Sequence, residues 1–207
     1  MAARRLPAHQ RRRQILHAAI RVFARGGLHG TTTREIAAEA DVAEALLYRH
    51  FEGKEDLFIA AMRLSADNMV KTIQEILNTH KDAPDTAVSE TLMYFKKIVE
   101  EQEDFAKMVF VITSELDNPK IRAVYLPYQD AALSALEDAI SYWKETGLLA
   151  RQVPGRATAW VLFGCFQTIA LMKQTERIEE LHVQPVLNLM RSFIQAKTPA
   201  PATAPAP

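Results

Sequence analysis

Four side chains that can hold a phosphate group lie close together in ALLYRHFEGKEDLF, residues 45–58. Tyr48, Arg49 and His50 are consecutive, and Lys54 follows after a short turn. Phenol, guanidinium, imidazole and ammonium groups donate hydrogen bonds or positive charge to the phosphate oxygens of nucleic acids. The stretch therefore indicates a surface that binds a polyanion.

A plainer interpretation of the same residues stays open. Tyr48 and Phe51 can be ordinary core aromatics, with His50 a solvated histidine. The flanking sequence favours the functional interpretation, in which Phe51 faces inward and the polar groups face outward.

Charge is distributed unevenly along a chain whose formal net charge is zero. Residues 1–34 contain eight arginines and no acidic residue, and residues 1–50 carry a net charge of +5. The remainder therefore carries −5, and a basic head on an acidic body indicates a polyanionic partner for the head. The arginines from Arg4 to Arg13 are either a solvated tail or an arm that contacts DNA.

The sequence contains little that indicates catalysis, metal binding or membrane insertion. Cys165 lies in an apolar run, where burial raises a thiol pKa and makes it inert, so we do not expect an enzyme. The six histidines lack metal-ligand spacing such as H-E-x-x-H, and we expect no metal and no cofactor other than a small effector. The longest uncharged run, residues 157–172, is shorter than the roughly 20 residues a membrane span needs. We expect a cytoplasmic protein without a membrane partner.

Apolar residues recur at spacings of three and four, and only seven glycines interrupt them, so the sequence predicts an all-α fold of about nine helices. Thr32 followed by Glu35 forms a capping box, and Asp41 suits a tight corner. The first three helices therefore form a helix-turn-helix head. The predicted helices are Gln14–Arg25, Thr32–Ala40, Glu44–His50, Glu55–Thr79, Asp85–Glu101, Phe105–Glu115, Pro119–Thr146, Gly155–Lys173 and Pro185–Ala196.

This pattern divides the chain into three parts. Residues 9–69 form the DNA-binding head with the start of the connecting helix. Residues 70–197 form a helical body, to which the family resemblance described below assigns ligand binding and dimerisation. The Pro/Ala-rich residues 198–207 cannot bury apolar surface and are expected to be disordered.

The segment TTTREIAAEADVAEALLYRHFEGKEDLF resembles the DNA-binding head of the tetracycline-repressor (TetR) family of bacterial transcription regulators. T-x-x-x-I-A-x-x-A-x-V and L-Y-x-H-F-x-x-K-E-x-L stand in the family's order, and the resemblance covers about residues 11–60. It implies that Thr33, Arg34, Tyr48 and Lys54 meet phosphate, with His50 nearby. Base contacts then fall to Glu44, Ala45, Leu46 and Arg49.

The sequence departs from the family pattern in and near the recognition helix. Asp41 stands where glycine is usual, Ala43 where Ser or Thr is usual, and Leu46 where Thr or Ser is frequent. Without the Ser/Thr cap the recognition helix loses about 1 kcal/mol and is expected to fray. Glu44 either accepts a hydrogen bond from cytosine or is a bystander.

The resemblance implies a dimeric repressor that binds a palindromic double-stranded DNA operator, in a bacterial nucleoid, and is released by a small apolar or amphipathic ligand. We expect helices near 156–173 and 185–196 to form the homodimer interface, although the first can instead be the centre of the body. Expected pocket residues are Phe95, Tyr128, Gln129 and Phe166. An enzyme and an adaptor that no longer binds DNA are the alternatives.

Overall fold

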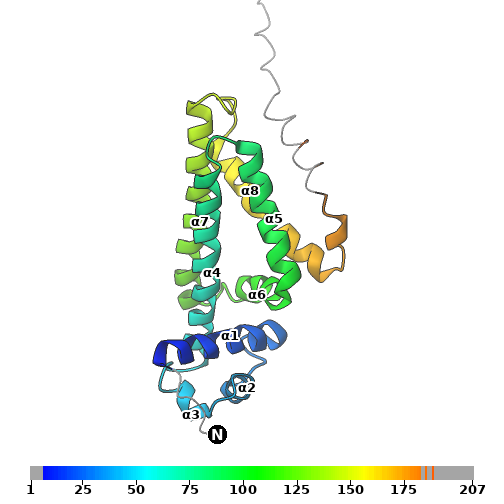
Figure 1. Cartoon of the computed structure of the whole chain (residues 1–207). Coiled ribbons are helices and arrows are strands. Elements are labelled where there is room, and N and C mark those ends of the chain that lie inside the picture. The colour runs from blue at the N-terminus through cyan, green and yellow to red at the C-terminus, as the bar shows by residue number, and fades with distance from the viewer. Residues whose placement is uncertain (1–6, 183–184, 186–187, 189–207) are drawn as a thin grey trace, which may run out of the picture.

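The computed structural model describes residues 7–182 together with residues 185 and 188. Within these residues the chain is all-α and contains no strand, which confirms the predicted fold class (Figure 1). The helices are α1 Ala8–Gly26, α2 Thr33–Glu39, α3 Glu44–Leu47, α4 Lys54–Thr79, α5 Pro84–Glu101, α6 Glu103–Ser114, α7 Pro119–Glu145 and α8 Gly155–Gln174, followed by the 3-10 turn η1 Ile178–Glu180.

The first helix begins six residues earlier than the sequence predicted. Pro7, whose φ of −53° is preset for a helix start, immediately precedes α1, and the arginines after it are good helix formers. Arg11, Arg12 and Arg13 therefore lie on a helix and not on a tail, and their contact with DNA stays a prediction. Arg4 and Arg5 lie outside the described residues.

The long helix α4 runs from the head into the body without a break (Figure 1). Leu57, Phe58 and Met62 at its start are buried in the head core, and Phe58 meets Phe23 of α1 edge-to-face, with ring centroids 5.0 Å apart. Val70 and later residues belong to the core of the body. The proposed boundary near residue 69 thus falls inside a helix that is shared by both cores.

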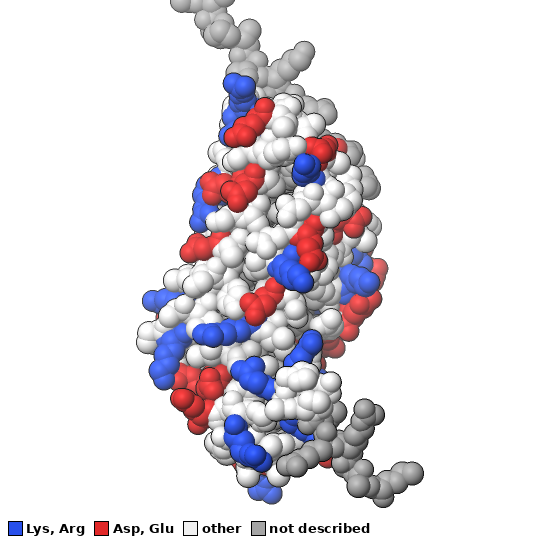
Figure 2. All heavy atoms as spheres, turned by 60° about the vertical axis from the view of Figure 1, so that its left-hand side comes forward, with Lys and Arg blue, Asp and Glu red and all other residues white. Residues whose placement is uncertain are grey.

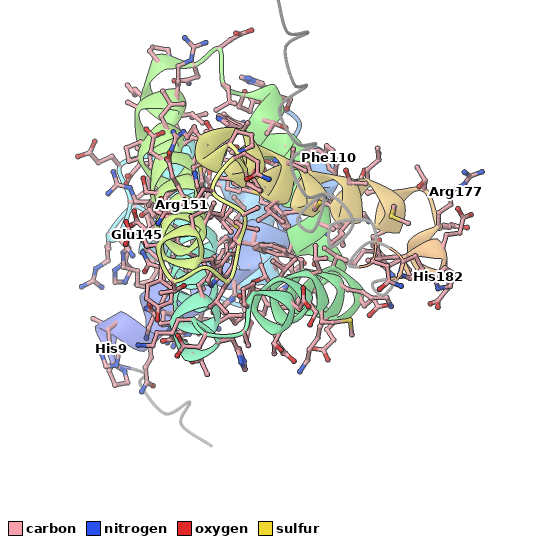
Figure 3. The ribbon with its side chains drawn as sticks, turned by 90° about the horizontal axis from the view of Figure 1, so that it is seen from above. His9, Phe110, Glu145, Arg151, Arg177 and His182 are labelled. Atoms are coloured by element: carbon pink, nitrogen blue, oxygen red, sulfur yellow. The ribbon has the colours of Figure 1, made fainter. Side chains whose placement is uncertain are left out.

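The body is formed by the upper part of α4 with α5, α7 and α8, and α6 lies across its lower end, next to α1 (Figure 1). Seen from above, the C-terminal end of α8 projects to one side, with Arg177 and His182 beyond it (Figure 3). Among the described helices, none is long and apolar enough to cross a membrane. The predicted helix at 185–196 and the tail at 198–207 lie outside the described residues, apart from Pro185 and Asn188.

Head and body are packed together through apolar side chains. Met108 and Ile112 of α6 and Ile121 of α7 are buried in the head core, although they come from the body of the sequence. Glu55, at the start of α4, accepts hydrogen bonds from Asn118 at 2.6 Å and Lys120 at 2.7 Å. The head and the body are therefore in direct contact through both apolar and polar side chains.

Candidate nucleic-acid interface

The helix α2 begins at the capping box that the sequence predicted. The Thr32 side chain accepts from the Glu35 backbone N–H at 3.2 Å, and the Glu35 carboxylate accepts from the Thr32 N–H at 2.7 Å. The bond from the Thr32 N–H, and then a bond of 2.9 Å that the Thr32 hydroxyl donates to the same oxygen, lower the pKa of the Glu35 carboxyl. The reciprocal cap fixes the point at which α2 begins.

The corner after α2 adopts the backbone conformation that usually requires glycine. Asp41 has a φ of +51°, in the left-handed region that short polar side chains tolerate. Ala43, the residue before α3, makes no side-chain cap, as the sequence predicted. The corner is therefore built with a strained residue and an uncapped helix start.

The recognition helix is shorter than predicted. Its α-helical part ends at Leu47, and the prediction that it reaches His50 was wrong. Tyr48 to His50 form a turn, in which the His50 N–H donates to the Leu47 carbonyl at 2.9 Å. The last turn of a helix tightens in this way because its final carbonyl groups lack the partners that a longer helix would supply.

Buried anchors hold this short helix on the head. Leu47 is 1% exposed and Phe51 is 4% exposed, which confirms that Phe51 faces inward. The guanidinium of Arg12 lies 4.9 Å from the centroid of the Phe51 ring. Gln14 of α1 donates to the Ala40 carbonyl at 2.7 Å, which ties the end of α2 to the first helix.

The predicted DNA-contact residues share the outer side of this scaffold. Tyr48 is 55% exposed, although it is a large aromatic side chain. Arg34, Ala45 and Arg49 are exposed as well. Lysine and arginine side chains gather toward the lower end of the molecule, where the head lies (Figure 2).

Leu46 and His50 are half-buried, so they present only part of their side chains to solvent. The His50 ring lies 6.4 Å from that of Phe51, between the core and the exposed face. Leu46 and His50 therefore lie at the edge of the exposed residues and remain partly packed against the head.

Thr33, Glu44 and Tyr48 form a hydrogen-bonded network between α2 and α3. The Thr33 hydroxyl donates to a Glu44 carboxylate oxygen at 2.6 Å and lies 3.1 Å from the Tyr48 hydroxyl oxygen. The sequence treated Glu44 as a base reader or a bystander. In the structure its carboxylate accepts from Thr33, and the same Thr33 hydroxyl also meets the Tyr48 hydroxyl. Thr33 and Tyr48 are both expected to meet phosphate.

Lys54 is half-buried at the first position of α4 and already has a protein partner. Its ammonium group donates to the Thr31 carbonyl at 2.7 Å. Two of its three N–H bonds stay available for another acceptor. Lys54 thus fixes the loop before α2 in addition to any contact with DNA.

Two arginines of the basic segment share one carboxylate at the surface of the head. Arg21 and Arg25 of α1 each bind a different oxygen of Glu39, both at 2.7 Å. These hydrogen bonds lower the pKa of the Glu39 carboxyl. The arginines that stay exposed near α3, Arg34 and Arg49, are therefore the stronger candidates for DNA contacts.

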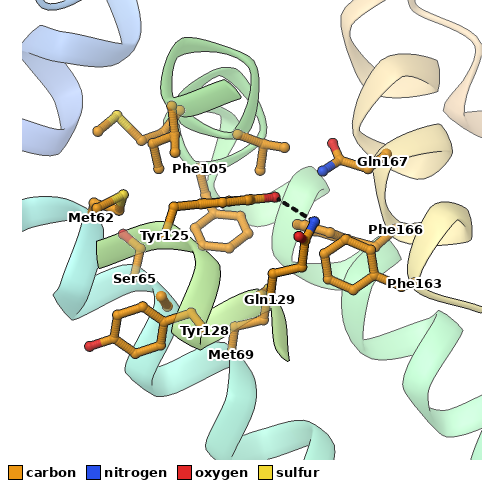
Figure 4. A pocket seen from close by; sticks show the side chains of 14 residues that line it. Met62, Ser65, Met69, Phe105, Tyr125, Tyr128, Gln129, Phe163, Phe166 and Gln167 are labelled. Carbon is orange, nitrogen blue, oxygen red and sulfur yellow. Dashed lines mark hydrogen bonds between the residues drawn. The ribbon is translucent and has the colours of Figure 1, made fainter. Parts of the chain in front are cut away.

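A mostly apolar cavity of about 60 Å³ lies in the body next to the head, between α4, α6, α7 and α8 (Figure 4). Tyr128, Gln129 and Phe166, which were predicted pocket residues, line it. Phe95 does not line it but lies one layer behind, with its ring centroid 4.4 Å from that of Phe166. Three of the four residues predicted to bind a ligand therefore line one cavity, and Phe95 lies behind it.

The sequence analysis missed Tyr125 and Gln167, which also line the cavity. Tyr125 lies one helical turn before Gln129, so the spacing of four could have placed them on one face. Gln167 follows Phe166 on α8 and carried no signal of its own.

The helix α8 exposes apolar side chains on its outer face. Val161 is 66% exposed, Leu171 is 50% exposed and Trp160 is 46% exposed. Other residues of the helix, including Phe163 and Phe166, are buried in the body core. The predicted interface segment 156–173 therefore contributes to the centre of the body and also leaves an apolar face uncovered.

The Bacterial regulatory proteins, tetR family model matches residues 15–61 of the chain. The transcriptional activator FasR of Mycolicibacterium smegmatis is 30% identical over 148 residues, which cover 72% of this chain and 66% of FasR. The chain thus spans just under two thirds of the length of FasR. The nicotine-responsive repressor HdnoR of Paenarthrobacter nicotinovorans is 27% identical over 165 residues, covering 78% of this chain and 84% of HdnoR.

The fold is also that of solved regulators. The structure of FadR from Bacillus subtilis in complex with stearoyl-CoA aligns with a TM-score of 0.69 at 18% identity, covering 90% of this chain and 99% of FadR. The matched head, the relatives and the shared fold agree with the geometry of the α2–α3 unit. The chain belongs to the TetR family of bacterial transcriptional regulators, a family of regulators rather than enzymes.

Proposed function

We propose that the protein is a repressor that binds a palindromic DNA operator as a homodimer and is released by a small molecule. The observation that carries the DNA-binding part is the exposed position of Tyr48, Arg34 and Arg49 on a head whose core is fixed by Leu47 and Phe51. In helix-turn-helix proteins the second helix enters the major groove, and the first contacts the backbone. Here α3 would enter the groove, while Thr33, Tyr48 and Lys54 would meet phosphates.

Base contacts in this proposal come from the exposed end of α3. Arg49 can pair with guanine, and Ala45 or Leu46 can touch a thymine methyl group. Glu44, whose carboxylate accepts from Thr33, supports the phosphate-binding groups. Three exposed or half-exposed residues are few for a specific site, so two heads are needed.

The apolar outer face of α8 supports dimerisation. Trp160, Val161 and Leu171 lie on a helix whose residues 157–172 include no charged side chain. Two copies of this face would bury each other and set the distance between the two heads. The predicted segment 185–196 would extend the same interface.

Ligand release is supported by side chains that the cavity and the head share. Met62, Met108 and Ile112 line the cavity and also pack in the head core. A ligand that enlarges the cavity must displace them, and this shifts α4 and α6 relative to α1. Moving the population from 1:99 to 99:1 requires about 5.5 kcal/mol of differential affinity.

The relatives support an apolar or amphipathic effector. FadR was solved with stearoyl-CoA, and HdnoR is named for its response to nicotine. The cavity fits this class because its lining includes no charged residue. FasR is an activator and HdnoR is a repressor, so these two relatives differ in the direction of regulation. Repression is proposed from the release mechanism described above.

The test measures how tightly the purified protein binds the DNA that flanks its own gene. Fluorescence anisotropy gives this affinity over a range of salt concentrations. Tyr48→Phe should weaken binding to every operator sequence alike, because phosphate contacts carry no base preference. Tyr142→Phe is the matched control, since its hydroxyl bonds Asp82 at the opposite end of the molecule (2.6 Å). Equal affinity of all three proteins would reject the phosphate role of Tyr48.

Repression is tested separately with a reporter gene behind the bound DNA. Deletion of the regulator should raise transcription if it represses. A fall in transcription after deletion would show an activator and overturn this part of the proposal.

A further inference from the structure

The cavity in the body is uncharged but has polar groups. None of its lining residues is Asp, Glu, Lys, Arg or His. Tyr125, Gln129 and Gln167 bring a phenol and two amides toward one another from α7 and α8 (Figure 4). The remaining walls are mostly aromatic and aliphatic, so these three groups decide which polar atom a ligand can bury there.

The hydrogen-bonding capacity of these groups is only partly used. Gln129 Nε2 donates to the Tyr125 hydroxyl oxygen at 3.4 Å, which is long for a hydrogen bond. Among the described residues, this is the one hydrogen bond found within the group, and none of the three groups is a buried side-chain atom that lacks a partner. Burial raises the pKa of Tyr125, so its hydroxyl keeps its proton at neutral pH. The cavity thus offers a cluster of uncharged donors.

Tyr128 lines the same cavity but does not join this cluster. Its hydroxyl points away from the other polar groups (Figure 4). Burial, and then the hydrogen bond with Asp67, raise the pKa of Tyr128. Tyr128 therefore gives the cavity only the side of its ring.

The cavity is so small that its walls must move when a ligand enters. A volume of about 60 Å³ is well below the roughly 300–1,000 Å³ of common ligand sites. Met62, Met69 and Met108 all line the cavity, and unbranched thioether side chains repack easily. A slender alkyl chain can therefore be admitted by rotation of these three side chains.

We infer that the effector carries an uncharged carbonyl group next to an apolar chain, and that this carbonyl accepts hydrogen bonds from Tyr125 and the neighbouring glutamines. This inference rests on the proposed ligand-binding function of the cavity. An ester, thioester or ketone supplies such an acceptor. A carboxylate does not fit, because burying it without a cation leaves its charge uncompensated.

The test measures dissociation constants by isothermal titration calorimetry with four probes of equal chain length. These are S-ethyl thiooctanoate, ethyl octanoate, octanoate and ethyl octyl sulfide, and the set is repeated with dodecanoyl and dodecyl chains. The wild-type protein should bind the thioester and the ester at least tenfold more tightly than the carboxylate and the sulfide. The ratio of thioester to ester then distinguishes the two carbonyl sources.

Tyr125→Phe should weaken binding of the preferred carbonyl probe about tenfold and leave binding of the sulfide unchanged. Tyr142→Phe removes a hydroxyl that bonds Asp82 outside the cavity and should leave both affinities unchanged. Gln167→Leu is a second variant that should also reduce the preference for the carbonyl. Thermal unfolding of each variant shows whether it is folded.

Three results would overturn the inference: tightest binding of octanoate, equal losses for carbonyl probe and sulfide in Tyr125→Phe, or no binding of any probe. Operator binding by the same protein samples is measured in parallel. If the carbonyl preference holds but no probe changes operator affinity, release by ligand fails while the assignment of the cavity stands.

Discussion

The hydroxyl of Thr33 at the start of α2 donates to the carboxylate of Glu44 at the start of α3, over 2.6 Å. This bond joins the two helices of the helix-turn-helix unit on the side where Tyr48 is exposed. A carboxylate is unusual beside a surface that meets phosphates, because like charges repel. Its hydrogen bond with Thr33, whose hydroxyl also meets that of Tyr48, gives it a structural purpose that its charge alone does not suggest.

Glu44→Gln should therefore strengthen DNA binding without changing base preference. Glutamine keeps an oxygen that can accept from Thr33, and it removes a negative charge near the phosphates. We expect affinity to rise about two- to fivefold at low salt. The measurement is binding to a set of operators in which each base pair is varied in turn. A reader of cytosine would instead lose about 1–3 kcal/mol of discrimination at one position.

Ala43→Ser should supply the cap that α3 lacks. Ala43 has an extended backbone and makes no side-chain hydrogen bond, and a serine oxygen there can accept from a free N–H of the first turn. We expect a stabilisation of about 1 kcal/mol, observed as slower hydrogen exchange of the amides from Glu44 to Leu47. Ala45→Ser, in the same helix but beyond the cap position, is the control. Equal exchange in both variants would count against fraying as a property of α3.

Gly30→Ala should destabilise the head, whereas Gly53→Ala should not. A Cβ atom at Gly30 would lie 2.4 Å from the Gly26 carbonyl oxygen, which is backbone and cannot rotate away. At Gly53 no atom lies within 4 Å of the added Cβ, and the φ of 177° suits any residue. Urea unfolding should show a loss of about 1–3 kcal/mol for the first variant only. Similar midpoints for the two variants would contradict the close packing of this loop.

Acid should weaken the link between α1 and α2. Hydrogen bonds from Arg21 and Arg25 lower the pKa of Glu39 below its ordinary value of 4.5. A group with a lowered folded-state pKa stabilises the protein above its unfolded pKa, and this contribution is lost as the pH falls through the folded value. We expect the thermal midpoint of the wild type to decline below about pH 4.5 partly for this reason.

The variant Glu39→Gln is the control for this decline in the thermal midpoint at acidic pH. The variant should be less stable than the wild type at pH 7 and should approach it in acid, because its side chain has no proton to gain. Differential scanning calorimetry at a series of pH values measures both curves. A constant difference between them down to acidic pH would show that the ionised carboxylate contributes nothing.

Local patterns in the sequence determined much of the head. The capping box of Thr32 and Glu35, the corner at Asp41 and the inward position of Phe51 depend on neighbouring residues, and the structure has all three. Apolar periodicity placed the ends of most helices within one or two residues for the same reason. The start of α1 was missed because a polar first turn carries no apolar signal, although Pro7 marked it.

Only the tertiary structure decided which polar groups are free and which are used. Glu44, Lys54 and the Arg21–Arg25 pair all look available in the sequence, but each is bound by a residue 11 to 23 positions away. The cavity likewise joins four helices and places Tyr125 beside Gln129 and Gln167, with Phe95 behind its wall. Contacts between distant segments depend on how helices pack, and helix periodicity fixes which face is buried without fixing its neighbour.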